Sequence, residues 1–403
     1  MHYDVIIIGG GAAGMMAAAA AFGSVCLIEK NDCLGKKVAM TGGGRCNVTN
    51  ATDVDGILSK TVSNPHFLYS ALYGFTPDDM RAFLNDNGVQ TKIEVGGRVF
   101  PVSDKSSDII AAFGRNLKDK DVKVRCNTEV LGLACFDEYF EVKTNKDTLK
   151  CRHLIIATGG LSYPGTGSTG DGLAFAKSLG HKIIPPCPAL TPLICSDAWV
   201  HELMGLSLAN VHLTAKVNGR TLFDDVGDVI FTHFGISGPL ALSASAYLAG
   251  YTASELTIDF TPNSTKQDLE AQLLEYFKSN PNRSVKSALE QYLPKKLTST
   301  ILVLTNISQD KKINAVTKDE RANLLAQIKT TTISIIGNRG FKEAVITAGG
   351  VSTKEIDSST MQSKKIPRLY FAGEMIDIHA LTGGYNLQIS FSTGHLAGSS
   401  AKD

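Results

Sequence analysis

The segment from residue 4 to residue 29 constrains the fold of this chain most strongly. An apolar run, Val5–Ile8, leads directly into a glycine-rich turn at 9–14, an alanine-rich stretch follows, and a second apolar run at 25–28 ends at Glu29. This order of strand, tight turn, helix, strand and acid is typical of the βαβ unit that binds a dinucleotide. The sequence therefore predicts an α/β fold with a nucleotide at its N-terminal end.

The glycines of this turn have separate roles in such a unit. Gly9 permits the turn out of the strand, Gly11 allows a pyrophosphate to approach the backbone, and Gly14 allows the helix to pack on the sheet. The N–H groups and the positive end of the helix then face the phosphates. Glu29 is placed to accept hydrogen bonds from a ribose diol, and a carboxylate there disfavours a 2′-phosphate. FAD or NAD is therefore expected rather than NADP.

Length and composition restrict the class of protein. A chain of 403 residues suggests two or three domains, and a net charge of +1 gives no overall attraction to nucleic acid or membrane. The eight cysteines include no CxxC pair and no zinc-ligand spacing, so we expect reduced thiols, no metal site and a cytoplasmic location. No long uncharged apolar run predicts a membrane span, and the first apolar run is a strand rather than a signal peptide.

The pattern along the chain changes twice. Prolines between 185 and 192 indicate a domain boundary, short alternating segments up to 262 predict a small β structure, and residues 265–329 keep helical spacing. The helical stretch carries 11 Lys and Arg against 7 Asp and Glu. This surplus fits a solvated helical face or an anionic partner. A strand at 369–372 and a final helix near Gly384 follow, so the middle of the chain resembles an insertion.

Two further glycine clusters favour FAD over NAD. One is Thr158-Gly159-Gly160 after a buried strand, and the other joins Gly373-Glu374 to the stretch 383–386. Such clusters converge if they end parallel strands at one sheet edge, where ligands bind. An NAD enzyme needs the first turn alone, whereas an extended flavin cofactor needs all of them.

The last helix is expected to act on the flavin ring. A helix that begins at Gly384 presents N–H groups and its positive end to the flavin pyrimidine, which stabilises the anion formed on reduction. An ordinary surface helix is the alternative. Asn386 and Gln388 either hydrogen-bond the ring edge or cap the helix.

A second GxGxxG match at 165–170 is not expected to be a second dinucleotide fold. No strand runs directly into it, because Ser162-Tyr163-Pro164 intervene, and no acid lies about twenty residues beyond it. We expect a flexible loop beside the cofactor, with Asp171 capping the next helix. NAD(P)H, if it is the reductant, then docks transiently on the flavin and leaves.

Four long motifs in order resemble the HI0933-like flavoproteins. They are Gly35–Asn47 with TGGGRCN at its core, Ser162–Gly172, Phe231–Pro239 and Gly383–Asn386. That family includes aminoacetone oxidases, reductases of bile-acid 7-dehydroxylation and ribosomal RNA dihydrouridine synthases. The resemblance implies a glutathione-reductase-like, Rossmann-type FAD domain split by an insert with a β-barrel part and a helical part. The expected boundaries are 1–188 and 346–403 for the FAD domain and 189–345 for the insert, with its β part at about 189–262 and 330–345 and its helices at about 263–329.

The motifs and the resemblance together predict a set of FAD-contacting residues. They are Gly9, Gly11, Ala12, Ala13, Gly14, Glu29, Lys30, Lys37, Thr41, Gly43, Gly44, Arg45, Cys46, Asn47, Thr158, Gly159, Gly160, Gly373, Glu374, Gly383, Gly384, Tyr385 and Asn386. Among these, Arg45 fits a cofactor phosphate or a substrate anion. Cys46 fits a buried filler better than a nucleophile, because no second cysteine lies at redox-pair spacing.

Three residues are candidates for a general acid: His233, His379 and Tyr385. His233 fits a structural hydrogen bond equally well, and the resemblance assigns His379 no role.

Three functions stay open at this point. The first is a reductase in which NAD(P)H reduces FAD and flavin N5 delivers hydride to an enone-like small molecule or to the uracil ring of ribosomal RNA, with the basic helices as a possible RNA-docking surface. The second is an oxidase of a small amine such as aminoacetone that forms hydrogen peroxide. The third is a flavin-containing RNA-binding or assembly factor without catalysis.

Overall fold

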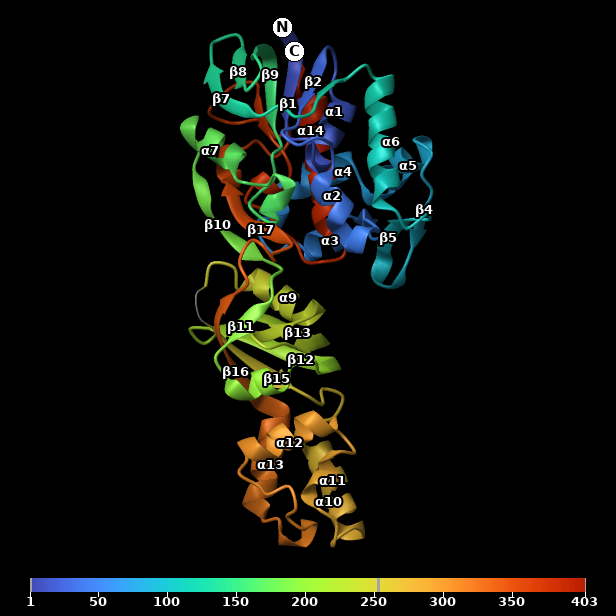
Figure 1. Ribbon diagram of the computed structural model, residues 1–403, viewed down its shortest axis with the longest axis vertical. Coiled ribbons are helices and arrows are strands. Elements are labelled where there is room, and N and C mark those ends of the chain that lie inside the picture. Colours follow the sequence, from blue (N-terminus) through green and yellow to red (C-terminus); the bar gives the residue numbers. More distant parts are fainter. Residues whose placement is uncertain (1, 252–253, 403) are drawn as a thin grey trace. The chain divides into compact units, whose positions relative to one another are not determined.

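The computed structural model describes residues 2–251 and 254–402 and divides into two compact units (Figure 1). The first unit contains the residues up to Pro188 and those from Phe341 onward, and the second contains Ala189–Gly340. The expected insert end at 345 is therefore displaced to Gly340. The reason is that the chain already contacts the first unit at Phe341, whose carbonyl accepts a hydrogen bond from the Tyr163 N–H at 3.1 Å.

The first unit is built on a largely parallel sheet. Its strands are β1 (His2–Ile8), β2 (Val25–Ile28), β6 (Lys123–Arg125), β7 (Val130–Cys135), β8 (Phe140–Thr144), β9 (Thr148–Ile156) and β18 (Leu369–Phe371). The order is β6-β2-β1-β9-β8-β7, with β18 parallel to β9. This arrangement confirms the Rossmann-type α/β fold class.

The register of the sheet brings the glycine clusters to one edge. Ile8 at the end of β1 lies opposite Ile28 and Ile156, and Ile156 also lies opposite Phe371. The next residue of each strand therefore emerges at the same carboxyl edge. Apolar side chains bury the centre of this sheet, because β1 and β9 carry continuous runs of Ile and Leu at their ends, whereas the edge strands β6 and β7 stay largely exposed.

Two helices cover the sheet beside that edge. Helix α1 (Ala12–Ala20) lies against α14 (Tyr385–Ser400), as Figure 1 shows. Glycines allow the close approach, since a Cβ added at Gly394 would lie 2.3 Å from the carbonyl oxygen of Ala13. The backbones of the two helices therefore pack directly on each other.

The other elements of the first unit surround this core. The helices are α2 (Lys36–Met40), α3 (Val54–Ser59), η2 (Pro65–Leu68), α4 (Tyr69–Gly74), α5 (Pro77–Asp86), α6 (Ser106–Asp119) and α7 (Asp171–Ser178). A small antiparallel sheet has the order β3 (Thr49–Asn50), β5 (Arg98–Pro101) and β4 (Thr91–Ile93), and β10 (Ile183–Ala189) pairs with β17 (Ile346–Val351).

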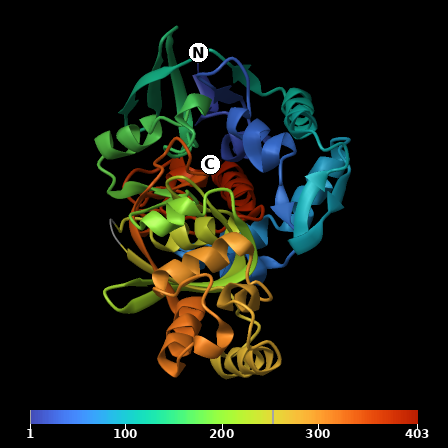
Figure 2. The same ribbon diagram turned by 60° about the horizontal axis from the view of Figure 1, so that its bottom comes forward.

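The second unit contains a closed barrel and a group of helices inserted between two of its strands (Figure 2). The barrel order is β11 (Leu193–Cys195), β14 (Gly235–Ser237), β13 (Arg220–Phe231), β12 (Ser207–Val217), β15 (Ser254–Asp259) and β16 (Thr331–Asn338). Helices α8 (Ala198–Glu202) and α9 (Pro239–Tyr247) accompany it. Between β15 and β16 lie α10 (Lys266–Ser279), α11 (Val285–Leu289), α12 (Lys295–Leu304) and α13 (Lys318–Thr330). Their buried leucines and isoleucines join the barrel residues in one apolar core.

All eight cysteines are free thiols. Among residues 2–251 and 254–402, no helix combines the length and the apolar character needed to cross a membrane.

Candidate functional site

The glycine-rich turn after β1 is shaped for a ligand as well as for the chain. Gly9 has φ +104° and a Cβ at Gly14 would lie 1.8 Å from the carbonyl oxygen of Gly9, so the fold itself requires both glycines. A Cβ at Gly11 would meet nothing within 4 Å. The protein alone does not require glycine at 11, and the open space beside it fits a cofactor. Ala12 and Ala13 open α1 directly after it, and no side chain caps the helix.

Glu29 is buried at the end of β2 and its carboxylate is held in place by its neighbours. One oxygen accepts the Gly10 N–H at 2.7 Å, and the other accepts the Asn31 N–H at 2.8 Å and the Asn31 side-chain amide at 2.7 Å. The oxygen that accepts the Gly10 N–H keeps a lone pair for a further donor, whereas the other oxygen already accepts two hydrogen bonds. A fixed carboxylate beside the glycine turn suits a ribose diol.

The second GxGxxG segment is a loop tied to the end of β2. Lys30 pairs with Asp171 at 2.6 Å and with the Thr169 hydroxyl at 2.5 Å, and Asn31 donates to the carbonyl of Thr166 at 2.9 Å. The expectation that Asp171 caps α7 is wrong: Gly170, with φ +87°, is the N-cap, and the Asp171 carboxylate turns to Lys30 instead. Lys30, which was expected to contact FAD, here anchors this loop.

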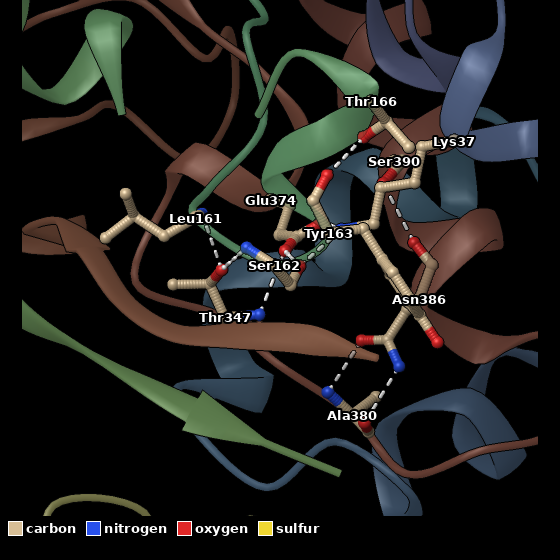
Figure 3. Close-up of polar contacts among 10 residues, drawn as sticks. All are labelled: Lys37, Leu161, Ser162, Tyr163, Thr166, Thr347, Glu374, Ala380, Asn386 and Ser390. Atoms are coloured by element: carbon tan, nitrogen blue, oxygen red, sulfur yellow. Dashed lines mark hydrogen bonds and ion pairs between the residues drawn. The ribbon is translucent and has the colours of Figure 1, made fainter. Parts of the chain in front are cut away.

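A partly buried ion pair joins residues from three distant segments (Figure 3). The Lys37 ammonium lies 2.5 Å from one oxygen of Glu374 and 2.5 Å from the Ser162 hydroxyl, which donates to the other Glu374 oxygen at 2.6 Å. That second oxygen also accepts the Thr347 N–H at 2.9 Å. The Thr347 hydroxyl in turn accepts the N–H of Leu161 at 2.8 Å and that of Ser162 at 3.0 Å.

This network keeps Glu374 ionised inside the protein. Burial raises the pKa of the Glu374 carboxyl, but the charge and hydrogen bond of Lys37, together with Ser162 and Thr347, outweigh burial and lower the pKa overall. Ser162 and Thr347 were not among the expected site residues. Ser162 lies inside a motif quoted for the family resemblance, whereas nothing in the local sequence distinguishes Thr347.

The neighbouring glycine clusters are close to the same network. A Cβ at Gly160 would lie 2.3 Å from the Thr347 hydroxyl, and Gly373 donates its N–H to Thr393 at 3.0 Å. Gly159 and Gly373 both have left-handed backbones, with φ +74° and +76°. The Thr158 hydroxyl oxygen is buried without a hydrogen-bond partner in the part of the chain that the structure describes. A Cβ at Gly172 would lie 2.0 Å from it, so this hydroxyl packs against the first turn of α7 and is not offered to a ligand.

The loop after α2 combines open glycines with a buried thiol. Gly43 and Gly44 have φ +66° and +89°, and a Cβ at either would meet nothing within 4 Å. Thr41 donates to the carbonyl of Val38 at 2.7 Å, and Asn47 accepts the Val99 N–H at 3.2 Å. Both side chains thus brace the loop.

Cys46 is fully buried in this loop. Burial raises the pKa of its thiol to about 11, against a smaller lowering by a hydrogen bond with Thr41. A protonated, inaccessible thiol does not act as a nucleophile.

Arg45 is engaged by other protein groups. Its guanidinium pairs with Glu94 and, at 2.6 Å, with Asp104, and it lies 4.1 Å above the ring centre of Phe100. Hydrogen bonding from Arg45 lowers the pKa of Glu94. Lys92 also pairs with Asp104 at 2.5 Å. In this arrangement two carboxylates already compensate the charge that was expected to meet a cofactor phosphate.

The start of α14 offers a ligand backbone groups rather than side chains. Gly383 and Gly384 have φ +131° and +96°, and a Cβ at Gly384 would lie 2.4 Å from the carbonyl oxygen of Thr49. No side chain caps the helix. The first N–H groups and the positive helix end can therefore stabilise an anion.

The two amides of this helix hold the chain rather than cap the helix. Asn386 accepts the Ala380 N–H at 2.9 Å and donates to the carbonyls of Ala380 and Leu381 at 2.8 and 3.1 Å (Figure 3). Gln388 is fully buried and binds Thr49 at 2.7 Å and the carbonyl of Phe75 at 3.0 Å. Both side chains position the N-terminus of α14.

The candidate acids lie in different surroundings. His379 is buried, and its Nδ1 lies 2.9 Å from the Ser63 hydroxyl. Tyr385 is partly buried in the first turn of α14, and burial raises the pKa of its hydroxyl. His233 belongs to the second unit, on the turn between β13 and β14. His379 and Tyr385 belong to the first unit, which also contains the glycine edge, whereas His233 belongs to the second unit.

These residues fit FAD. Gly11, Gly43 and Gly44 leave open space, and two uncapped helix ends offer N–H donors. Phosphates and the flavin pyrimidine need such donors. Glu29 and the uncapped ends of α1 and α14 would hold the cofactor.

Comparisons with known proteins agree with this assignment. The model of the HI0933-like protein Rossmann domain matches residues 3–400. The chain is 34% identical over 370 residues to the ribosomal RNA dihydrouridine synthase of Escherichia coli, with 92% of this chain and 90% of that protein covered. The enzyme of the same name from Haemophilus influenzae is 34% identical over 380 residues, covering 92% and 91%.

A bile-acid enzyme and two solved structures are also similar to this chain. The 3-dehydro-bile acid delta(4,6)-reductase of Clostridium scindens is 30% identical over 384 residues, covering 94% of this chain and 93% of that protein. A quinol fumarate reductase of E. coli has a TM-score of 0.51 at 16% identity, covering 100% of this chain and 70% of that one. A 3-ketosteroid delta1-dehydrogenase from Sterolibacterium denitrificans has a TM-score of 0.50 at 15% identity, covering 98% of each chain. The two structures support the fold alone.

Proposed function

The chain belongs to the HI0933-like family and is an FAD-dependent oxidoreductase, and on this premise we propose that it reduces a uracil ring in ribosomal RNA to dihydrouridine. The observation that carries the proposal is the match to two ribosomal RNA dihydrouridine synthases over 92% of the chain. The overall reaction consumes NAD(P)H and a proton and converts the C5=C6 double bond of uracil to a single bond. A bile-acid reductase among the relatives supports a double bond as the acceptor.

FAD, when bound, supplies hydride transfer to an electron-poor double bond. In this proposal Glu29 holds the ribose, and the open turn at Gly11 admits the pyrophosphate. The uncapped start of α14 favours negative charge on the pyrimidine side, because its N–H groups and positive end are fixed there by Asn386 and Gln388. The partly buried Lys37–Glu374 pair fixes the segment between these two ends.

A proton donor must accompany hydride transfer to carbon. The candidates are His233, His379 and Tyr385, since the hydrogen bond between Ser63 and Nδ1 of His379 involves one ring nitrogen and does not exclude this imidazole. His233→Ala, His379→Ala and Tyr385→Phe separate the three: the donor is the residue whose loss lowers turnover while FAD content stays unchanged.

NAD(P)H is proposed as a transient reductant. Among residues 2–251 and 254–402, the complete βαβ nucleotide unit is β1-α1-β2, and the loop at 165–170 begins within a 3₁₀ turn, Pro164–Thr166, instead of directly after a strand. NAD(P)H therefore docks at the flavin and leaves. A cytoplasmic location follows from this proposal, because NAD(P)H and ribosomal RNA are both found there.

The helices α10–α13 are proposed to contact RNA phosphates. Their stretch, 265–329, carries 11 cations against 7 anions, and Lys295, Lys296 and Lys312 are exposed. Some cations are engaged in pairs, such as Lys311 with Glu320 at 2.5 Å. The exposed surplus is sufficient for phosphate contacts, which supply affinity without sequence preference.

Complementation tests the proposal. An E. coli strain that lacks its own ribosomal RNA dihydrouridine synthase is supplied with this chain, and dihydrouridine in 23S ribosomal RNA is measured by mass spectrometry. We expect the modified base to return with the wild-type chain and to stay absent with Gly11→Trp, which blocks the cofactor turn. Absence of dihydrouridine despite folded, FAD-loaded wild-type protein refutes the proposal.

A second assay separates the proposed reductase from an amine oxidase and from a non-catalytic RNA-binding factor. Purified protein should consume NADH or NADPH anaerobically when RNA is offered. Rapid peroxide formation with aminoacetone in air would instead identify an amine oxidase. RNA binding without any NAD(P)H consumption would identify a non-catalytic factor.

A further inference from the structure

Three aromatic rings form an exposed ladder on the first unit. They belong to His66 in η2 and to Tyr69 and Tyr73 in α4. The His66 and Tyr69 ring centres are 5.7 Å apart with planes at 17°, and those of Tyr69 and Tyr73 are 6.3 Å apart with planes at 11°. Spacings of three and four residues place all three rings on one helical face.

The fold does not use this face for its core. Leu68, Ala71 and Leu72, on the other side of the same segment, are fully buried. Tyr69 and Tyr73 remain 42% and 62% exposed. The three stacked rings therefore lie on the exterior of this unit, where a further ring can reach them.

The ladder lies next to the segment that holds the start of α14. The strand-like stretch before it pairs with the loop before α14: the Val62 N–H donates to the carbonyl of His379 at 2.8 Å, and the Leu381 N–H to that of Lys60 at 2.9 Å. Asn386 binds the same loop from the first turn of α14.

At its other end, α4 is also joined to α14. The carbonyl of Phe75, directly after α4, accepts hydrogen bonds from Gln388 at 3.0 Å and from Ser392 at 2.6 Å. The aromatic ladder and the candidate flavin helix thus belong to one connected body within the first unit, as the neighbouring α4 and α14 ribbons in Figure 1 illustrate.

We propose that the His66–Tyr69–Tyr73 ladder is a stacking surface for bases of single-stranded RNA beside the reacting uridine. This inference rests on the proposed function and names the contact that presents its substrate. A uridine must leave its stack before its ring can be reduced, which leaves neighbouring bases unstacked. Exposed parallel aromatic faces are the groups on which such bases stack.

The charge near the ladder agrees with stacking as the source of affinity. The stretch from 54 to 74 carries one carboxylate, Asp55, and one ammonium group, Lys60. A surface with balanced charge neither repels nor strongly attracts phosphate. Removing the tyrosines should then weaken binding without changing its salt dependence.

Binding of a single-stranded RNA of about 12 nucleotides tests this surface. Fluorescence anisotropy at several salt concentrations compares FAD-loaded wild-type protein with Tyr69→Ala/Tyr73→Ala, Tyr69→Phe/Tyr73→Phe and Tyr69→Leu/Tyr73→Leu. Loss of stacking should raise Kd by roughly tenfold for each ring, with an unchanged salt slope. The Phe variant should bind like wild type, and the Leu variant like the Ala variant.

A matched control comes from another stacked pair in the same unit. Phe136 and Tyr139, at the turn between β7 and β8, have ring centres 4.7 Å apart, and Phe136 is 44% exposed. Phe136→Ala should leave RNA affinity unchanged. FAD content and urea unfolding show that each variant is folded.

The results separate the surface from the proposed function. RNA affinity that is unaffected by the Ala variant, or fully retained by the Leu variant, overturns the stacking surface even if dihydrouridine is formed. The second result points instead to an apolar partner such as a protein. A tyrosine-dependent Kd in a protein that forms no dihydrouridine keeps the surface and overturns the assigned reaction.

Discussion

Two glycines three residues apart should respond to the same substitution in opposite ways. A Cβ at Gly14 would lie 1.8 Å from the carbonyl oxygen of Gly9, and a Cβ at Gly11 would meet nothing within 4 Å. Gly14→Ala therefore disturbs the fold, whereas Gly11→Ala disturbs the cofactor. The pair tests whether the open space beside Gly11 belongs to FAD.

The magnitudes follow from the geometry. For Gly14→Ala, α1 must move by about 1.2 Å to restore a 3.0 Å contact. Overpacking of this kind lowers the free energy of unfolding by about 1–3 kcal/mol. Gly11 has φ −80° and ψ −168°, which alanine adopts without strain. Alanine lowers the conformational entropy of the unfolded chain, which stabilises the apoprotein, but it is a poorer N-cap than glycine, which destabilises it. Because these two effects offset each other, the free energy of unfolding of the apoprotein should change by less than about 0.5 kcal/mol.

For FAD binding, Gly11→Ala should be the more damaging of the two substitutions. A methyl group at Gly11 occupies the space through which the pyrophosphate approaches the backbone. The same overpacking cost of about 1–3 kcal/mol corresponds to roughly a 5- to 150-fold rise in the Kd for FAD.

Urea unfolding of the apoproteins and titration of FAD by flavin fluorescence measure the two effects separately. The reasoning fails if Gly11→Ala binds FAD as tightly as wild type, or if it destabilises the apoprotein as much as Gly14→Ala does.

Three further predictions follow from the site. Glu29→Ala should raise the Kd for FAD by roughly 5- to 150-fold, measured by flavin fluorescence, and an unchanged Kd would remove its role at the ribose. Glu374→Gln leaves the partly buried Lys37 ammonium without its counter-charge and should lower the free energy of unfolding by about 1–3 kcal/mol at neutral pH, less than for a fully buried pair because solvent screens the exposed part. Because the pKa of Glu374 lies below its usual 4.5, this difference should shrink below pH 4.5, and a pH-independent difference in urea unfolding would contradict the ion pair. Burial raises the pKa of Cys46 from 9.0 to about 11, so the unfolded chain loses this proton first and stability should fall above pH 9.0; Cys46→Ala should reduce that slope in urea unfolding.

The corrections have a common cause. Asp171 follows a glycine-rich loop directly, which predicts a helix cap, yet Lys30, distant in sequence, attracts its carboxylate at 2.6 Å. Arg45 follows three glycines, which predicts a phosphate contact, yet Glu94 and Asp104 surround its guanidinium. In both cases a long-range ion pair supplies a partner that the local pattern does not contain.

The βαβ unit, the helix that begins after Gly384 and the change from a β to a helical pattern could be predicted from local sequence. These features depend on apolar periodicity and turn chemistry, which act over a few neighbouring residues. Which side chains meet could not be predicted in this way. Lys37 and Glu374 pair across 337 positions, and Thr347, near the start of β17, braces both Ser162, which follows β9, and Glu374, which follows β18, the parallel neighbour of β9. Such contacts depend on strand order and register, which the local sequence pattern does not contain.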